Sequence, residues 1–254
     1  MNKGEMKVSV VTVTYNSAET IEETIKSVIS QNYKNLEYII IDGQSKDNTL
    51  NIVNIYKDKI ALVVSEKDLG IYDAINKGIK KATGDIIVAL NSDDMYASND
   101  IISKVVELFK STNADAVYGD LNYVDRFNTS KIIRKWKSGN YKKGQFLKGW
   151  MPPHPTFFVR NYCYEKYGIF NLSLKSAADY ELMLRFIHKH QIKVAYLPQL
   201  VVNMRAGGQS NVSFKNRYKA NKEDRKAWEM NGLKPGVFTL LRKPLSKIKQ
   251  YFNK

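Results

Sequence analysis

Two adjacent carboxylates, Asp93 and Asp94, follow the apolar run IIVAL at residues 86–90 after Asn91 and Ser92. Like charges at this spacing repel each other, so the pair calls for hydrogen-bond donors or for a cation. Ser, Asp and Asn side chains commonly cap helices by accepting hydrogen bonds from free backbone N–H groups. A divalent cation held by one or two carboxylates is the chemical alternative. Taken alone, the pair leaves a helix cap and a metal or phosphate site equally open.

Polar groups follow each of the four apolar runs in the first half of the chain. They are Tyr15 to Ser17, Asp42 with Gly43, Glu66 to Gly70, and Asn91 to Asp94. In open α/β sheets, ligands bind beyond the carboxyl ends of the strands. Capping explains each group separately, but it does not require carboxylates after three of four strands. The pattern therefore favours a ligand site at one shared edge of a sheet.

The elements that would position these groups alternate between two hydrophobic periods. Continuous apolar or β-branched runs predict strands at 7–15, 36–42, 60–66 and 85–90. Helical spacing predicts helices from Ser17, over 45–58 and over 71–83. Strands separated by helices with short links predict a mostly parallel α/β sheet built from βαβ units.

The later part of the chain is less regular. We expect strand and turn over 114–124, an extended proline-containing segment over 150–160, a helix over 177–190 and further strand over 192–208. The domain organisation predicted is one domain over 1–214 with a basic, partly amphipathic extension over 215–254.

Charge is unevenly distributed along the 254 residues, which carry 40 Lys or Arg against 25 Asp or Glu. The formal net charge of +15 favours anionic partners such as nucleotides, membrane surfaces or nucleic acid. Twelve basic and three acidic residues lie between Lys215 and Lys254, and eight basic residues and no acid lie between Arg126 and Lys148.

A single cysteine, Cys163, excludes an intrachain disulfide and indicates a reducing compartment. The N-terminus does not resemble a signal peptide, and no apolar run reaches the roughly 18 residues of a membrane span. These features predict a cytoplasmic protein, either soluble or peripheral on the inner face of the cell membrane.

Four motifs together resemble one family. The segments VSVVTVTYN, IIIDGQSKDNT, GIYDAINKGIKKATGDIIVALNSDD and AADYELMLR are similar, in order and spacing, to the inverting family 2 glycosyltransferases of GT-A fold. The resemblance covers about residues 7–210 and is greatest to the bacterial branch that builds capsule, exopolysaccharide and lipopolysaccharide O-chains. Each motif is weak singly, but four in register make the resemblance specific.

The resemblance implies a nucleotide-diphosphate sugar donor, most often a UDP-sugar, a Mg²⁺ or Mn²⁺ cofactor, and a glycan or polyprenyl-diphosphate-linked acceptor. It implies that the segment from Thr12 to Tyr15 and Asp42 hold the nucleoside, and that Asn91, Asp93 and Asp94 hold the ribose and metal. Asn91 stands where relatives usually carry an acid, which leaves more of the metal binding to Asp93. The implied donor-binding set is Thr12, Val13, Thr14, Tyr15, Asn16, Asp42, Asp68, Asn91, Ser92, Asp93, His154 and Arg205, with Asp93 and Asp94 as metal ligands.

Asp179 matches the catalytic base of the family. Inversion by a single displacement needs one carboxylate to take the proton of the acceptor hydroxyl. The alternative is an acid in the first turn of a helix, stabilised by the helix dipole.

Further basic residues have candidate roles, either at the site or in the fold. His154 lies either against the acceptor or diphosphate, or in a packed loop. Arg205 resembles the late flexible loop that can close over the diphosphate, for which a guanidinium is well suited. Lys77 and Lys80 face either the donor or solvent. His188 and His190, late in a helix, indicate structural roles.

The extension carries Val237, Leu241, Leu245, Ile248 and Phe252 at amphipathic helical spacing, interrupted by Pro244. This pattern predicts either peripheral contact with an anionic membrane or packing on the domain itself.

Two other functions are weighed against the transferase. Nucleic-acid binding through residues 126–148, where aromatic and basic residues interleave, gives no reason for carboxylates at the working edge of the sheet. A sugar-nucleotide pyrophosphorylase would need a glycine-rich loop after the first strand, and that position reads TYNSAET.

Overall fold

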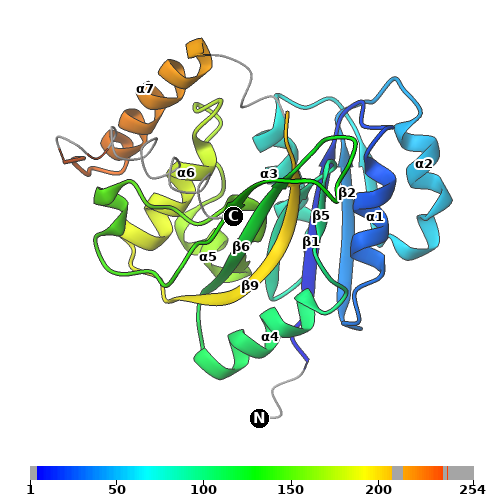
Figure 1. Ribbon diagram of the computed structural model, residues 1–254, viewed down its shortest axis with the longest axis horizontal. Helices are drawn as coiled ribbons and strands as arrows, with labels where there is room; N and C mark the ends of the chain where they lie inside the picture. Colours follow the sequence, from blue (N-terminus) through cyan, green and yellow to red (C-terminus); the bar gives the residue numbers. More distant parts are fainter. Residues whose placement is uncertain (1–4, 208–213, 237–238, 240–254) are drawn as a thin grey trace.

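A computed structural model describes residues 5–207, 214–236 and 239 of the chain. A nine-stranded mixed sheet runs through the molecule with helices on both faces (Figure 1). The strand order is β3-β2-β1-β4-β8-β6-β9-β5, and β7 pairs with β6. The strands are β1 (Val8–Thr14), β2 (Leu36–Asp42), β3 (Leu62–Ser65), β4 (Ile86–Asn91), β5 (Asp94–Tyr96), β6 (Ala116–Val124), β7 (Ile132–Trp136), β8 (Phe158–Arg160) and β9 (Val194–Arg205).

The helices differ widely in length. The α-helices are α1 (Ile21–Ile29), α2 (Thr49–Ile55), α3 (Ile71–Lys81), α4 (Ile101–Thr112), α5 (Asn161–Tyr167), α6 (Ala178–Met183) and α7 (Phe214–Met230). Short 3₁₀ segments are η1 (Lys57–Lys59), η2 (Gln145–Lys148) and η3 (His154–Thr156). A π-helical segment, η4 (Leu184–Lys189), continues α6.

The first four predicted strands form the parallel half of the sheet. β1 lies between β2 and β4, and its seven residues are all buried, as the continuous β-branched run predicts. Thr14 pairs with Asp42 and Val13 with Asn91. This register brings the carboxyl ends of the three strands to one edge, so the expected parallel βαβ arrangement is confirmed.

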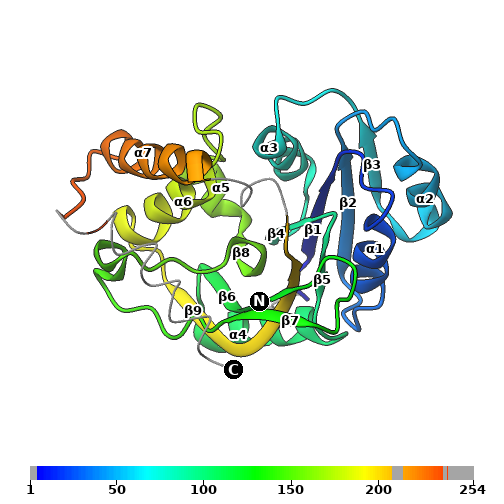
Figure 2. The same cartoon turned by 45° about the horizontal axis from the view of Figure 1, so that its top comes forward.

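Two hydrophobic clusters cover the two faces of the sheet. One face of β1 and β2 packs against α3, and the cluster continues through α5 and α6. The other face packs against α1, α2 and α4. Figure 2 shows α1 and α2 beside β1 to β3, with α5, α6 and α7 grouped beyond β4 and β8.

The close packing of α3 on the sheet depends on a glycine. A Cβ at Gly78 would lie 2.1 Å from Cγ1 of Val11, so no larger residue fits without displacing α3 from β1. The position of the first turn of α3, which carries Tyr72, is set by this contact.

The sequence reasoning missed several elements of the second half. Residues 101–112 form α4, whose buried face is Ile101, Ile102, Val105, Val106 and Phe109. Strands β5, β7 and β8 pair antiparallel with β9, β6 and β4 respectively. These strands are three to five residues long, too short for a hydrophobic period to register.

Part of the expected C-terminal extension packs on the domain. Trp228 of α7 is buried, and its Nε1 donates to the hydroxyl of Tyr180 in α6 at 2.9 Å. Glu223 and Asn231 also contact α6 or the residues before it. The amphipathic positions Val237, Leu241, Leu245, Ile248 and Phe252 lie outside the described residues.

No helix within the described part of the chain is long and apolar enough to cross a membrane.

Candidate functional site

The loops after β1 and β2 are tied to each other at the carboxyl edge of the sheet. Asn16, with a left-handed φ of 49°, accepts a hydrogen bond from the N–H of Lys46 at 2.8 Å, and its own N–H donates to Ser45 Oγ at 2.8 Å. The buried Asp42 accepts from the N–H and Oγ of Ser45 and from Ser65 Oγ. Asp42 therefore links the ends of β2 and β3, and Ser45 links them to Asn16 after β1.

Beside this network, Tyr15, Gly43 and Asp68 form a corner at the carboxyl edge of the sheet. Tyr15 is 57% exposed, and a Cβ at Gly43 would lie 2.4 Å from Oδ2 of Asp68 and 3.4 Å from the ring of Tyr15. Tyr15, Gly43 and Asp68 are thus neighbours, with an aromatic ring and a carboxylate close to a residue that has no side chain. This arrangement suits a planar base with hydrogen-bonding edges.

The expected nucleoside segment is only partly at this edge. The side chains of Thr12 and Val13 are buried inside the sheet, where Thr12 Oγ1 accepts from the Tyr38 hydroxyl at 3.2 Å. Thr14 is also buried, and its Oγ1 has no hydrogen-bond partner among the described residues. The structure therefore brings Tyr15 and Asn16 to the site, but not the side chains of Thr12 and Val13.

The two carboxylates after β4 have different surroundings. Asp93 is half-buried, whereas Asp94 is fully buried, and its Oδ1 has no hydrogen-bond partner in the described chain. Asn91 Nδ2 lies 3.4 Å from the other oxygen of Asp94. Burial raises the pKa of Asp93, and burial together with the charge of Asp93 raises the pKa of Asp94 well above its usual range. Asp93 therefore presents the accessible carboxylate, with Asp94 behind it.

The turn that carries these carboxylates is held from two sides. Ser92 Oγ donates to Ser17 Oγ at 2.8 Å, which joins it to the loop after β1. Arg205 donates from Nη1 to the carbonyl of Asp93 at 2.9 Å and from Nε to the carbonyl of Arg126 at 3.1 Å, and it forms an ion pair with Glu23.

Arg205 differs from its expected setting. It is the last residue of β9 rather than part of a flexible loop, and it is 3% exposed. Its guanidinium is already engaged with two carbonyl groups and one carboxylate, so the structure supports a role in holding Asp93. Arg126 is the more exposed cation, and its charge works to lower the pKa of Asp93.

The donor set near Asp93 fits a divalent ion that is shared with a ligand. No group of three or more His, Cys, Asp or Glu side chains suited to a metal occurs in the parts of the chain that the structure describes. Mg²⁺ is commonly bound by one or two carboxylates together with substrate phosphates. The half-buried carboxylate of Asp93 fits that pattern, with the buried Asp94 behind it, whose Oδ1 has no hydrogen-bond partner among the described residues.

Asp179 lies in a second cluster, at the first turn of α6. Its Oδ1 accepts a hydrogen bond from the hydroxyl of Tyr72 at 3.2 Å. The Tyr72 ring stacks on Phe170 at 5.5 Å, and His154 meets the edge of Phe170 at 5.4 Å. Asn76 Nδ2 donates to the Phe170 carbonyl at 2.8 Å, and its Oδ1 accepts from the Phe170 N–H at 2.9 Å. Residues distant in sequence are thereby fixed around one carboxylate.

Burial sets the charge states in this cluster. It lowers the pKa of His154, although the charge of Asp179 works in the opposite direction. His154 is therefore neutral near pH 7 and can donate or accept a hydrogen bond, but it supplies no positive charge for a diphosphate. Burial, with Asp179 nearby, raises the pKa of Tyr72 well above its usual range, so its hydroxyl stays a donor.

A carboxylate from α7 caps the start of α6. Glu223 Oε2 accepts from the N–H of Ser176 at 2.8 Å, from the N–H of Ala177 at 3.1 Å and from Ser176 Oγ at 2.9 Å. Free N–H groups at a helix N-terminus favour such a partner. Glu223 therefore supports the turn that carries Asp179.

The other titratable residues singled out from the sequence have structural contacts. His190 stacks on Tyr167 at 4.2 Å, and His188 meets the edge of Trp228 at 5.2 Å. Lys77 donates to the Lys67 carbonyl at 2.7 Å and lies 3.0 Å from Glu66, so it ties the loop before α3 to that helix. Lys80 is exposed.

The aromatic residues of the basic stretch 126–148 do not form a row for stacking bases. Phe146 is fully buried in the core, Tyr141 packs on Trp150 at 5.2 Å, and Phe127 is 86% exposed. Most of these aromatic residues therefore contribute to the fold.

The structure thus has an α/β sheet with carboxylates at its carboxyl edge and a further carboxylate, Asp179, in the first turn of α6. A family model described as Glycosyl transferase family 2 matches residues 9–167, more than half of the chain. The chain belongs to glycosyltransferase family 2 and is a glycosyltransferase.

Relatives agree with this assignment. An uncharacterized glycosyltransferase of Mycobacterium tuberculosis is 31% identical over 183 residues, 70% of this chain and 68% of the relative. A PGL/p-HBAD biosynthesis glycosyltransferase of Mycobacterium bovis is 26% identical over 212 residues, 80% of this chain and 78% of the relative.

Solved structures show the same fold. TarS 1–349 of S. aureus, solved with UDP-GlcNAc, has a TM-score of 0.68 at 18% identity, over 89% of this chain and 65% of that one. The mannosyltransferase PcManGT of Pyrobaculum calidifontis, solved with GDP-Man and Mn²⁺, has a TM-score of 0.67 at 19% identity. The match covers 95% of this chain and 70% of that one. The expected GT-A fold is confirmed, and the pyrophosphorylase alternative is wrong.

Several residues of the site were not found from the sequence. Tyr72, Phe170 and Glu223 surround or support Asp179, and Arg126 lies near Asp93. Tyr72 and Asn76 are four residues apart and therefore lie on one face of α3. This spacing is the one feature of the sequence that could have indicated Tyr72 as a site residue. No local pattern indicated that Phe170 or Glu223 would meet that face.

Proposed function

We propose that the protein is a metal-dependent inverting glycosyltransferase that moves a sugar from a nucleotide-diphosphate sugar to a glycan or lipid-linked acceptor. The expected donor is a UDP-sugar. The observation that carries the proposal is the pair of separate carboxylate sites, Asp93 at the end of β4 and Asp179 at the start of α6. One suits a cation beside a diphosphate, and the other suits removal of a proton from an acceptor hydroxyl.

The nucleoside would bind at the corner formed by Tyr15, Gly43 and Asp68, with Asp42 fixing the strand end beneath it. Asp93 would hold Mg²⁺ or Mn²⁺, which when bound stabilises negative charge on the leaving nucleoside diphosphate. Asn91 and Ser92 lie beside this turn and would reach the ribose. The nucleotide-sugar ligands of TarS and PcManGT, and the Mn²⁺ of PcManGT, support this choice of donor and ion.

Asp179 would act as the general base. Tyr72 orients its carboxylate by donating to Oδ1, which leaves the other oxygen for the acceptor hydroxyl. Neutral His154 lies beside the same cluster and would hydrogen-bond the acceptor. The acceptor would belong to surface polysaccharide synthesis, as the motif resemblance implies.

A panel of UDP-, GDP- and dTDP-sugars, assayed by thermal shift with and without Mn²⁺, tests the donor and the ion, because a ligand that binds the folded state raises its apparent stability. We expect one nucleotide class to raise the melting temperature only when Mn²⁺ is present. A panel without any Mn²⁺-dependent shift would contradict the proposal.

A further inference from the structure

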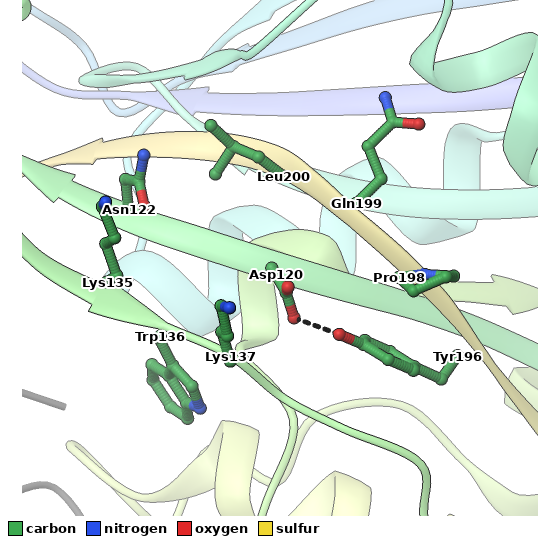
Figure 3. Close-up of a pocket in the computed structure, with 9 residues that line it drawn as sticks. All are labelled: Asp120, Asn122, Lys135, Trp136, Lys137, Tyr196, Pro198, Gln199 and Leu200. Carbon is green, nitrogen blue, oxygen red and sulfur yellow. Dashed lines mark hydrogen bonds between the residues drawn. The ribbon is translucent and has the colours of Figure 1, made fainter. Parts of the chain in front are cut away.

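A cavity of about 450 Å³ lies on the second half of the sheet, and its lining residues belong to neither of the two carboxylate sites. Strands β6, β7 and β9 and the residues next to them supply its lining, with Asp120, Asn122, Lys135, Trp136, Lys137 and Gln199 among them. Figure 3 shows Asp120 pointing toward Tyr196, with Asn122 and Lys135 together at the other end of the cavity. A cavity of this size suits a ligand of one or two sugar rings.

The cavity opens on the face of the sheet that carries the candidate base. Asp120 accepts a hydrogen bond from the Tyr196 hydroxyl at 2.8 Å, and the Tyr196 ring stacks on Tyr118. Tyr118 belongs to the hydrophobic cluster that includes Ala178 and Tyr180, the neighbours of Asp179 in α6. Asp120 and Asp179 are therefore on the same side of the sheet.

Two series of contacts connect the cavity to the two carboxylate sites. Gly119, next to Asp120, contacts Thr156 Oγ1 through its N–H at 3.3 Å and through its carbonyl at 3.2 Å. Thr156 lies in η3 together with His154. At the other end, Tyr123 pairs with Met204, and Met204 pairs with Asp94. Neighbouring strands lie about 4.8 Å apart, so Asn122 is within about two strand spacings of the Asp93 turn.

The lining combines hydroxyl-binding groups with unpaired positive charge. One oxygen of Asp120 accepts from Tyr196 and from the N–H of Ser138, which fixes this carboxylate in the cavity. Lys135 and Lys137 form no ion pair within the described parts of the chain. A carboxylate and amides recognise sugar hydroxyls, whereas two lysines favour an anion.

We propose that this cavity is an acceptor subsite for an anionic saccharide unit, a sugar that carries a carboxylate or a phosphate. The proposal rests on the proposed function and names the chemical class of its acceptor. The hydroxyl groups of the sugar meet Asp120, Asn122 and Gln199, and its negative charge meets Lys135 and Lys137. An anion without hydroxyl groups would have no donor for the Asp120 carboxylate, so the cavity favours a ligand with both features.

The test uses ¹⁹F NMR of the full chain labelled with 5-fluorotryptophan, without donor or metal, because Trp136 lines the cavity. The chain has three tryptophans, and a Trp136→Phe sample assigns the signal. The probes are methyl β-glucuronide, methyl galacturonide and glucose 6-phosphate, with methyl β-glucoside as the neutral match. We expect a saturable shift of the Trp136 signal with at least one acidic probe and a much weaker response to the glucoside. The uronides and the sugar phosphate distinguish the two sources of charge.

A matched pair of double variants tests the lysines. The double variant Lys135→Ala, Lys137→Ala should bind the acidic probe with an affinity about fivefold to tenfold lower, as expected for the loss of two partly exposed charge contacts. Lys142→Ala with Lys148→Ala removes the same charge from the same basic stretch outside the cavity and should leave the affinity unchanged. No shift with any acidic probe, equal binding of the glucoside, or equal weakening by both double variants would overturn the proposal. Donor binding with Mn²⁺, measured separately by thermal shift, shows whether the proposed function itself has failed.

Discussion

The hydroxyl of Tyr72 donates to Oδ1 of Asp179 at 3.2 Å and joins the first turn of α3 to the first turn of α6 across 107 residues of sequence. The Tyr72 ring is held by its stack on Phe170, and the helix that carries it is held against β1 by the close contact of Gly78 with Val11. The orientation of the candidate base therefore depends on the packing of α3 on the sheet.

Replacing Tyr72 with Phe keeps the stack on Phe170 and removes the hydrogen bond to Asp179. A hydrogen bond to a charged group contributes about 1.5–3 kcal/mol, so we expect kcat to fall by about tenfold or more. The KM for the donor should stay the same, since Tyr72 is not at the nucleoside corner. Steady-state kinetics checks this, with Tyr33→Phe as the control, because the Tyr33 hydroxyl bonds the Met6 carbonyl instead. An unchanged kcat for Tyr72→Phe would show that Tyr72 does not position the base.

The two carboxylates after β4 should respond differently to substitution. Asp93→Asn removes the accessible carboxylate, and we expect it to abolish the Mn²⁺-dependent thermal shift caused by the donor. Asp94→Asn should reduce that shift less, because Asp94 is fully buried behind the turn. Equal loss in both variants would indicate that Asp94 ligates the ion directly.

Asp94 should also cost stability in the metal-free protein. Its pKa is raised in the folded state, so its contribution to stability is fully present below the unfolded pKa near 3.9 and is lost as pH rises through the folded pKa. At pH 7, Asp94→Asn should raise the free energy of unfolding by about 1 kcal/mol or more, because a neutral amide replaces a carboxyl whose ionised form is disfavoured by burial and by the charge of Asp93. Urea unfolding of the metal-free variant tests this, and a lower midpoint would contradict it.

Glu37 provides a prediction about the opposite edge of the sheet. Despite its burial, hydrogen bonds from Lys7, Ser9 and Thr83 lower the pKa of Glu37 to about 2. The stabilisation is therefore present above about pH 4.5, its ordinary value, and is lost as pH falls toward 2.

The free energy of unfolding of Glu37→Gln should be about 2 kcal/mol lower than that of the wild type near neutral pH. Between about pH 4.5 and 2, the variant should lose less stability than the wild type. Unfolding monitored by circular dichroism across this range measures both effects. The exposed Glu22, paired with Lys26, is the control, and Glu22→Gln should change little. Parallel pH curves for Glu37→Gln and the wild type would refute this account.

The parallel half of the fold could be predicted because its signals are local. Long buried strands such as residues 36–42 read as continuous apolar runs, and their carboxyl ends mark where ligands bind. Asp93 could be selected because it follows such a strand, whereas Asp179 was selected through the family resemblance of the motif AADYELMLR.

The surroundings of those residues depend on contacts that no local pattern encodes. Thr12 and Val13 share a motif with Tyr15, yet both are buried. Strand alternation turns Val13 toward α3 and Thr12 toward Tyr38 on the opposite face of the sheet. Arg205 precedes a flexible-looking glycine pair, but pairing with β5 and β6 extends β9 to include it. Glu223 caps α6 only because α7 packs beside it, a contact made 46 residues away in sequence from Ala177.

The most direct test of the account is the single-turnover rate of Asp179→Asn with the UDP-sugar or other nucleotide-sugar donor identified in the thermal-shift panel. Removing a general base typically costs 10²- to 10⁴-fold, so we expect a loss of roughly that size with the Mn²⁺-dependent thermal shift of the donor preserved. Transfer at a near wild-type rate by Asp179→Asn would contradict the assignment of Asp179 as the base.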